Sequence, residues 1–486
     1  MFRKKPAVQE VLFIPGKLSD FIPEDHVLKR VNRVLDLSWL DEEMRGHYHD
    51  SLGRPCIEPE RAVRLMLAGF LHGVVEDRRL MREAQVNIAY RWFAGYDLDS
   101  ALPDHSSLTR IRQRWGEEKF REIFERTVKM CADAGMVGGD MVHCDATLVR
   151  ANVSWESLVA TYVEQSIQAN PREEADNTEA EMKEDSPILK GIKRKVKGKV
   201  KKRSRTDPEA SMATSSNKIR LEPTYKQHTA VDDLAGIVVD VEVTTGETNE
   251  GSQLMNQLER VEATTGKKPK VITCDRTYGS ANNYLALEQQ GIEALIPPQK
   301  AGRPTSNFPL CRFAYDAKNQ VVRCPAGKIL TRAHRSNKGW FYQAKRCDCA
   351  SCRLRQQCVP ASCRSRIVLI LDGYCALVRA RRKKAQGWDD DCVNAYKRHR
   401  YQVEGVHGEA KTVHGMRRAV RRGTCNMRIQ SYLTNAAINL KRLASHAHGR
   451  LTGTYSRLHR VLRRLIIRIF QQMSPYQVNC LCMSLN

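Results

Sequence analysis

The sequence predicts a mixed α/β protein of several domains, and three observations support this. Its 486 residues are about three times a typical domain of roughly 150 residues. Hydrophobic residues make up 41% of the chain, which is enough for folded cores. Alternating apolar and polar residues, typical of strands, fill the middle of the chain, and apolar residues at helical spacing lie before and after them. We therefore expect an α/β core flanked by helices.

The charge balance points to a polyanionic partner. A net charge of +25 attracts nucleic acid whatever its sequence, although a basic surface kept for solubility or a ribosomal partner explains charge alone. The chain has no apolar run of 18 residues, so we expect no membrane span. Its first residues lack the apolar run of a signal peptide. We expect a cytoplasmic protein whose 16 cysteines are thiols or metal ligands rather than disulfides.

Four helices are expected before the strands. Glu58 and Glu60 precede an apolar run that ends near Gly73, and acids in a first turn suit the helix dipole. Later helices are expected at 77–93, at 107–115, and along a stripe from Phe120 to Cys131. Such helices could bind DNA through basic faces, and a plain bundle that packs on the core is an equal alternative.

Strands are expected next, and two of them carry aspartates. From Met141 to Val149 apolar residues alternate with a face that carries Asp145. A short apolar strand is expected from Val271 to Cys274, and Asp275 follows directly at its end. The remaining strands are expected at 225–231, 237–243 and 293–297, with helices near 254–263 and 282–290.

A third carboxylate lies on a late helix between two cations. Arg400, Glu404 and Lys411 sit at i, i+4 and i+11, which an α-helix places on one face. Three carboxylates on separate elements are what two-metal phosphoryl chemistry needs. Because 130 residues separate Asp145 from Asp275 and 129 separate Asp275 from Glu404, only a folded core can gather them.

Each residue alone also has an ordinary structural explanation. Arg400 and Glu404 form the spacing of a helix ion pair worth a few tenths of a kcal/mol. An aspartate at a strand end is commonly a surface or turn residue. The joint pattern, rather than any one residue, favours a site.

The pattern resembles the DDE transposases of bacterial insertion sequences. The Arg-x3-Glu-x6-Lys spacing is typical of that family, and residues 143–148 and 274–280 resemble its first and second catalytic strands. Residues 54–115 resemble the helical domain that precedes the core, and the likeness runs from about residue 54 to about 445. The family often has Tyr three positions before the Arg, where this chain has Lys397.

The resemblance implies an α/β fold with an RNase H-like core, an N-terminal helical domain and a Cys-rich insertion. It implies that Asp145, Asp275 and Glu404 are catalytic and bind Mg²⁺ (or Mn²⁺). Phosphate or DNA would be held by Arg400 and Lys411, with Lys226 and His228 as further candidates on the second strand. His407 is a weaker candidate.

The implied activity is DNA transposition. The chain would bind the terminal inverted repeats of its element, cut there, and join the 3′ ends to target DNA without a covalent protein–DNA intermediate. We expect double-stranded DNA as partner, at least a homodimer that pairs two ends, and a location at the nucleoid in the cytoplasm. A metal-dependent nuclease without strand transfer and an inactive, zinc-containing DNA-binding relic are the alternatives.

Two segments interrupt the expected core. Residues 165–215 are acidic and then strongly basic, with ten Lys or Arg from Lys190 to Arg205. This block is a solvated linker or a DNA-gripping segment. The second segment, 298–385, contains half of the cysteines, at the short spacings of a structural zinc site. The favoured set is Cys324, Cys349, Cys352 and Cys358. Cys347 or Cys363 could replace one member, and reduced cysteines in a small core are the alternative.

These features divide the chain into six predicted regions. The regions are an N-terminal extension at 1–50, a helical domain for DNA binding or assembly at 51–136, the first part of the catalytic core at 137–297, the Cys-rich insertion at 298–385, the catalytic and closing helices at 386–446, and a basic C-terminal tail at 447–486.

Overall fold

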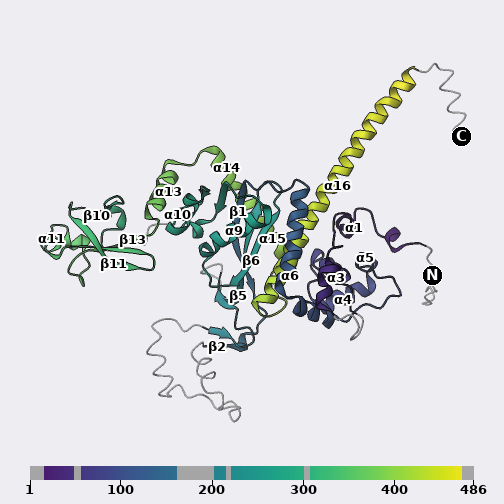
Figure 1. Ribbon diagram of the computed structural model, residues 1–486, viewed down its shortest axis with the longest axis horizontal. Helices are drawn as coiled ribbons and strands as arrows, with labels where there is room; N and C mark the ends of the chain where they lie inside the picture. The colour runs from purple at the N-terminus through teal and green to yellow at the C-terminus, as the bar shows by residue number, and fades with distance from the viewer. Residues whose placement is uncertain (1–15, 49–55, 161–201, 215–219, 300–306, 473–486) are drawn as a thin grey trace, which may run out of the picture. The chain divides into compact units, whose positions relative to one another are not determined.

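The computed structural model describes residues 16–48, 56–160, 202–214, 220–299 and 307–472, with only the backbone of 451–472 described (Figure 1). The chain forms two compact units, one made by Met1–Gly116 with Ala436–Asn486 and the other by Glu117–Asn435. Most of the predicted charged segment at 165–215 lies outside the described residues, as do the first 15 and last 14 residues. In the described part of the chain, no helix combines the length and apolarity that a membrane crossing requires.

The first unit is helical. Its central helix, α3 (Pro59–Leu71), begins with Pro at its first position, which suits a helix start, and is buried on nearly every side. Asn87 caps α5 by accepting hydrogen bonds from the backbone N–H groups of Ala89 and Tyr90. The other helices are η1 (Leu18–Phe21), α1 (Val27–Asn32), α2 (Leu40–Met44), η2 (Arg45–His47), α4 (Asp77–Val86) and α5 (Ile88–Phe93).

Helix α6 (His105–Asp133) is broken at Gly116. This glycine has φ 71° and ψ 175°, a conformation that L side chains rarely adopt, so the helix changes direction there. The sequence predicts two helices in this stretch, and the break confirms that prediction. The division between the two compact units falls at the same residue.

A buried ion pair joins α4 to α6 within the first unit. Arg112 donates two hydrogen bonds of 2.8 Å to the two carboxylate oxygens of Asp77, and Thr109 donates a third. Only 2% of the Arg112 side chain and 7% of the Asp77 side chain are exposed. Two charges buried this deeply are stable only when they are paired with each other.

The core of the second unit is a mixed sheet. Its strands are β1 (Met141–Arg150), β4 (Ser211–Ala213), β5 (Glu222–Asp232), β6 (Val238–Thr245), β7 (Val271–Cys274) and β8 (Glu293–Leu295). They lie in the order β6-β5-β1-β7-β8, with β4 also paired to β5. The first three are antiparallel, whereas β1, β7 and β8 are parallel, as the intervening helices α9 (Leu254–Thr265) and α10 (Ala281–Gln289) require. The predicted strands and helices are confirmed.

Several short strands were not predicted, and two of them form a ribbon. β2 (Leu158–Ala160) and β3 (Lys202–Ser204) pair as an antiparallel two-stranded ribbon. With only three residues each, neither strand carries enough alternation to be recognised from sequence.

The late helices are α13 (Tyr374–Gln386), α14 (Asp390–His399), the π-helical segment η7 (Arg400–Glu404), α15 (Gly405–Thr412) and α16 (Thr424–Gln472). The segment η7 contacts β1 and β5, and α14 contacts β7. These late helices therefore meet the central strands of the sheet.

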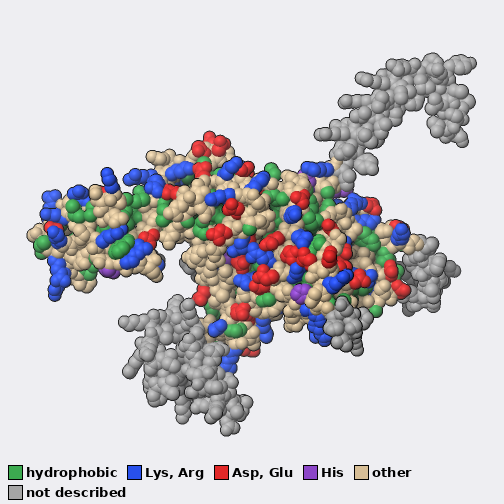
Figure 2. All heavy atoms as spheres, in the orientation of Figure 1, with side chains coloured by type: hydrophobic (Ala, Val, Ile, Leu, Met, Phe, Trp, Pro, Cys, Tyr) green, Lys and Arg blue, Asp and Glu red, His purple; other side chains and the backbone are tan. Residues whose placement is uncertain are grey.

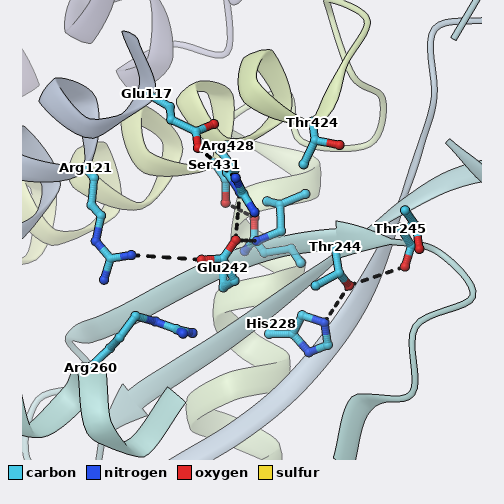
Figure 3. A network of polar contacts seen from close by, with 12 residues as sticks. Glu117, Arg121, His228, Glu242, Thr244, Thr245, Arg260, Thr424, Arg428 and Ser431 are labelled. Carbon is cyan, nitrogen blue, oxygen red and sulfur yellow. Dashed lines mark hydrogen bonds and ion pairs between the residues drawn. The ribbon is translucent and has the colours of Figure 1, made fainter. Parts of the chain in front are cut away.

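A network of charged residues joins helices to the sheet edge (Figure 3). Arg428 of α16 donates to Glu117 of α6 at 2.7 Å and to Glu242 of β6 at 2.8 Å. Arg260 of α9 makes a bidentate pair with the buried Asp240 of β6. Three helices are thus held to one strand by paired charges.

The Cys-rich segment forms a second sheet with its own small core. The antiparallel strands β9 (Ala314–Asp316), β10 (Val321–Arg323), β11 (Ile329–Ser336), β12 (Gly339–Ala344) and β13 (Ile367–Leu371) lie in sequence order, with η6 (Leu310–Arg312), α11 (Arg346–Ala350) and α12 (Arg355–Cys358) beside them. Strand β13 buries Val368 and Ile370 in this core.

We expect Asp77→Ala to lower the free energy of unfolding by about 3–5 kcal/mol, because it leaves Arg112 charged and buried without a partner. The measurement is urea denaturation followed by circular dichroism. Glu58→Ala is the control, since Glu58 pairs with Arg61 on the exposed surface and should cost under about 1 kcal/mol. Equal costs for the two variants would contradict this role for Asp77.

Candidate active site

Strand β1 turns one face toward the late helices. His143, Asp145 and Thr147 alternate along it and therefore share that face. His143 and His399 of α14 both contact the hydroxyl of Thr273, at 2.6 and 3.0 Å. Asp145 Oδ2 lies 3.6 Å from His407 Nδ1, and Lys411 Nζ donates to Thr147 Oγ1 at 2.6 Å. Along this face, His143 therefore lies beside α14, and Asp145 and Thr147 contact α15.

Asp145 and Asp275 are neighbours through strand register. In the parallel pairing of β1 with β7, Cys144 is the partner of Cys274, and each cysteine is followed by an aspartate. Adjacent strands lie about 4.8 Å apart, so the two aspartates lie next to each other. Asp275 is further held by Thr277, which donates from its backbone N at 2.8 Å and from its hydroxyl at 3.0 Å.

Four carboxylates influence one another at this point. Burial, together with the nearby Asp275, Glu250 and Glu404, raises the pKa of Asp145 to about 7. Only 20% of the Asp145 side chain is exposed, so water screens these charges weakly. A cation bound here would relieve both the repulsion and the desolvation of Asp145.

The helix that carries Glu404 differs from the predicted α-helix. Its first turn, η7, is π-helical, so its turns are wider than 3.6 residues and the expected alignment of positions 400, 404 and 411 is shifted. Arg400 and Glu404 pair at 3.5 Å, with 80% and 56% of their side chains exposed, and neither lines the cleft beside Asp145. Lys411 does line it.

His407 occupies the buried position that faces Asp145. Its ring Nε2 lies 3.0 Å from the hydroxyl of Thr229. Burial, together with Lys411 and the imidazoles of His399 and His228, lowers the pKa of His407 to about 3, so the ring is neutral at pH 7. A neutral ring fixed by Thr229 can orient Asp145 without adding positive charge.

A cleft of about 850 Å³ opens over these residues. Acidic and basic side chains both line it, and they include Asp145, Asp275, Glu222, Glu250, Arg150, Arg220, Lys226, Lys411 and Arg417. The carboxylates of this lining provide oxygen ligands that a hard divalent ion prefers, and its cations provide positive charge that suits phosphate.

Lys226 reaches the cleft but is already paired. Its Nζ lies 3.0 Å from Glu250 Oε1 and donates to the backbone oxygen of Thr248 at 2.8 Å. Glu250 begins the short helix η4 (Glu250–Gln253), where an acid would ordinarily be interpreted as a helix-dipole partner. Glu250 was not predicted from the sequence. An acid at a helix start has the same local pattern whether it interacts with the helix dipole or lines the cleft.

His228 does not enter the cleft, contrary to the sequence interpretation. The register pairs Asp145 with Thr229 and Ala146 with His228, and directly paired residues point to the same side of a sheet. His228 therefore lies on the face opposite Asp145, fully buried, with Nε2 2.9 Å from Thr244 Oγ1 (Figure 3). Burial lowers the pKa of His228 to about 3, so this neutral ring cannot hold a phosphate.

The donor set suits a hard divalent ion. Mg²⁺ prefers carboxylate oxygen, usually takes one or two protein carboxylates, and keeps several waters. Among the described residues, no three His, Cys, Asp or Glu side chains are drawn tightly enough together to ligate a metal ion as they stand. The in-register Asp145–Asp275 pair, together with the raised pKa of Asp145, fits an ion bound through these two carboxylates.

Comparison with known protein families identifies both parts of the chain. A transposase domain (DUF772) matches residues 16–114, and a transposase DDE domain matches residues 323–444. The chain is therefore similar to DDE transposases in two segments that together span less than half of its length. The first match begins well before residue 54, where the sequence resemblance was placed. The second contains Arg400, Glu404 and Lys411 of this chain but not the strands that carry Asp145 and Asp275.

No curated protein matches the chain. Among solved structures, the piggyBac transposase synaptic complex with hairpin DNA is 10% identical, with 87% of this chain and 81% of that chain covered and a TM-score of 0.29. The Mos1 transposase paired-end complex with left transposon end is 11% identical, with 53% and 65% covered and a TM-score of 0.16. The Mos1 strand transfer complex is 12% identical, with 76% and 83% covered and a TM-score of 0.17.

We expect Asp145→Asn to stabilise the protein in EDTA at pH 8 by on the order of 2 kcal/mol. Because folding raises the pKa of Asp145 from 3.8 to about 7, the wild type loses stability as pH rises through that window. The gain in the variant should therefore be smallest near pH 4 and reach a plateau above pH 7. Urea denaturation across pH measures it.

Asp140→Asn provides the matched control. Asp140 is exposed, and its ion pair with Lys270 lowers the pKa of Asp140. Its neutralisation should therefore give no gain in stability at pH 8. If both variants respond alike to pH, the carboxylate cluster does not govern the titration.

Proposed function

We propose that this chain is an active DNA transposase with an RNase H-like core, in which Asp145, Asp275 and Glu404 bind two Mg²⁺ or Mn²⁺ ions. The observation that carries the proposal is the in-register placement of Asp145 and Asp275 on adjacent parallel strands, with Glu404 close enough to raise the pKa of Asp145. The strand order, three antiparallel strands followed by two parallel ones, supports the core assignment.

The chain's own residues would prepare the site for phosphoryl transfer. Thr277 fixes Asp275 through two hydrogen bonds, and His407 contacts Asp145, so both carboxylates are oriented before DNA binds. Two divalent ions, when bound, would neutralise charge on the attacking and leaving oxygens of a phosphodiester. Lys411 would bring a positive charge to a neighbouring phosphate, and burial lowers the pKa of Lys411, so its ammonium gains from meeting an anion.

Around this site the cleft would hold the DNA backbone. Arg150, Arg220 and Arg417 line it with guanidinium groups, which bind phosphates in a bidentate manner. Such contacts position DNA without reading its sequence. We propose that the helical N-terminal unit contributes to binding the terminal inverted repeats or to assembly, and that two copies pair the element ends.

We expect cleavage of a labelled duplex carrying the element end to require Mg²⁺ or Mn²⁺ and to fall by roughly a hundredfold or more in Asp145→Ala, Asp275→Ala and Glu404→Ala. Gel analysis of the products, with a target duplex added to detect joined 3′ ends, measures both cutting and strand transfer. Asp140→Ala, an exposed aspartate that immediately precedes the same strand, is the matched control and should cut normally.

The possible outcomes separate the alternatives. Cutting without joined products would identify a nuclease. DNA binding without cutting by the wild type would identify an inactive relic. If Glu404→Ala cuts normally while Glu250→Gln does not, the third carboxylate is Glu250 rather than Glu404.

We expect Lys411→Ala to weaken DNA binding about equally for all sequences and to reduce the slope of log affinity against log salt by about 1, because one phosphate contact is lost. Fluorescence anisotropy at several salt concentrations measures this. Lys383→Ala is the control, since Lys383 is exposed and paired with Glu293 outside the cleft. An unchanged slope for Lys411→Ala would exclude Lys411 from phosphate binding.

A further inference from the structure

Four cysteines from separate parts of the Cys-rich segment line one small cavity. Cys324 follows β10, Cys349 lies in α11, Cys352 lies in the next turn, and Cys358 ends α12. All four line a cavity whose interior volume is about 20 Å³. The other four cysteines between Cys311 and Cys375 do not line it.

The turn that carries Cys324 is shaped around its sulfur. Gly327 donates its backbone N–H to the oxygen of Cys324 at 2.8 Å, and Cys324 donates its own to the oxygen of Lys328 at 2.8 Å. Lys328 returns a backbone N–H to Cys324 Sγ at 3.3 Å. Gly327 has φ 78°, so the turn favours glycine there.

The four sulfurs also interact through charge. Cys349 and Cys358 are buried and Cys324 and Cys352 are partly buried, so little water lies between the four sulfurs to screen charge. Four thiolates this close repel one another unless a cation lies between them.

Basic residues surround the same cavity. Lys328, Arg355 and Arg366 line it together with the four cysteines. Arg355 donates to the backbone oxygen of Cys349 at 3.2 Å, and Arg366 donates to that of Cys358 at 3.0 Å. In Figure 2 the part formed by β9 to β13 shows mainly Lys and Arg among its charged side chains. Four thiolates around a divalent ion carry a net charge of about −2, which these cations would offset.

The apolar core of this sheet is small. It consists of ten buried residues, and two of the ten are Cys349 and Cys358 themselves. Strand β11 exposes most of its side chains. A fold with so little apolar burial commonly relies on a metal or a disulfide. In the described part of the chain every cysteine is a free thiol, so no disulfide supplies that support.

We propose that Cys324, Cys349, Cys352 and Cys358 form a structural zinc site that holds the Cys-rich sheet together. Thiolate sulfur is the preferred soft ligand of Zn²⁺, and four such ligands close a tetrahedral site with Zn–S distances of about 2.3 Å. As they stand, the sulfurs are not drawn into ligating distance of one point, so binding moves them toward the cavity centre. Each thiol releases its proton to solvent as it binds.

The cavity also decides between the cysteines that spacing alone left open. Cys347 is exposed although it lies only two residues before Cys349, because successive residues of α11 point to different sides. Cys363 packs against the small core and contacts Ser362, but it does not line the cavity. Neither residue belongs to the proposed zinc set.

The test is the zinc content of the full-length protein, purified in reducing buffer without chelator and measured by mass spectrometry of the metal. We expect about one zinc per chain. Cys349→Ser and Cys352→Ser should each lose most of it, whereas the matched controls Cys347→Ser and Cys363→Ser should keep it. Wild type without zinc, or equal loss in the controls, would overturn the proposal.

A second measurement on the wild type remains informative if the serine variants fail to fold. Thiol alkylation followed by peptide mass spectrometry should find the four proposed ligands protected until zinc is chelated, and Cys347 and Cys311 reactive throughout. Cobalt(II) added after chelation should give the visible absorption of a tetrahedral four-thiolate site. Alkylation that does not respond to chelation would refute the site. Neither readout depends on DNA cleavage.

Discussion

The parallel pairing of β1 with β7 is the constraint on which the candidate site depends. Cys144 and Cys274 are paired and buried, and the next residue of each strand is the aspartate that meets the cleft. Because side chains alternate across a sheet, a slip of one residue would turn one of these aspartates to the other face. The buried apolar residues of the sheet therefore fix the position of the two acids.

The late helices complete the site by covering the face that carries Asp145. The buried contacts come from His399, His407 and Lys411, which meet Thr273, Thr229 and Thr147 of the sheet. Each of these three side chains thereby has a hydrogen-bond partner in the sheet, as buried polar groups commonly need. The π-helical turn before α15 leaves Glu404 more exposed than Lys411. Lys411, by contrast, is anchored to Thr147 of the sheet.

Acidic or ionisable side chains lie close together in two places, and the chemical groups differ between them. In the cleft, acids raise the pKa of Asp145 and lysines and arginines surround them. In the Cys-rich sheet, four thiols share a small cavity lined by basic residues. Both arrangements favour a divalent cation, with oxygen ligands suited to Mg²⁺ in one and sulfur ligands suited to Zn²⁺ in the other. The charged network of Arg428 and Glu242, by contrast, is satisfied within the protein itself.

The sequence by itself determined the order of elements in the core and the family resemblance, because alternation in β1, β5 and β6 and the spacing around Glu404 are local patterns. It also supplied both aspartates at their strand positions. Only the tertiary structure decided which neighbours they meet. The strand register places His228 on the face opposite Asp145. Long-range packing places Glu250 beside Lys226 in the cleft. Packing also separated Cys349 from Cys347. These outcomes depend on contacts between residues far apart in the chain, which no local pattern encodes.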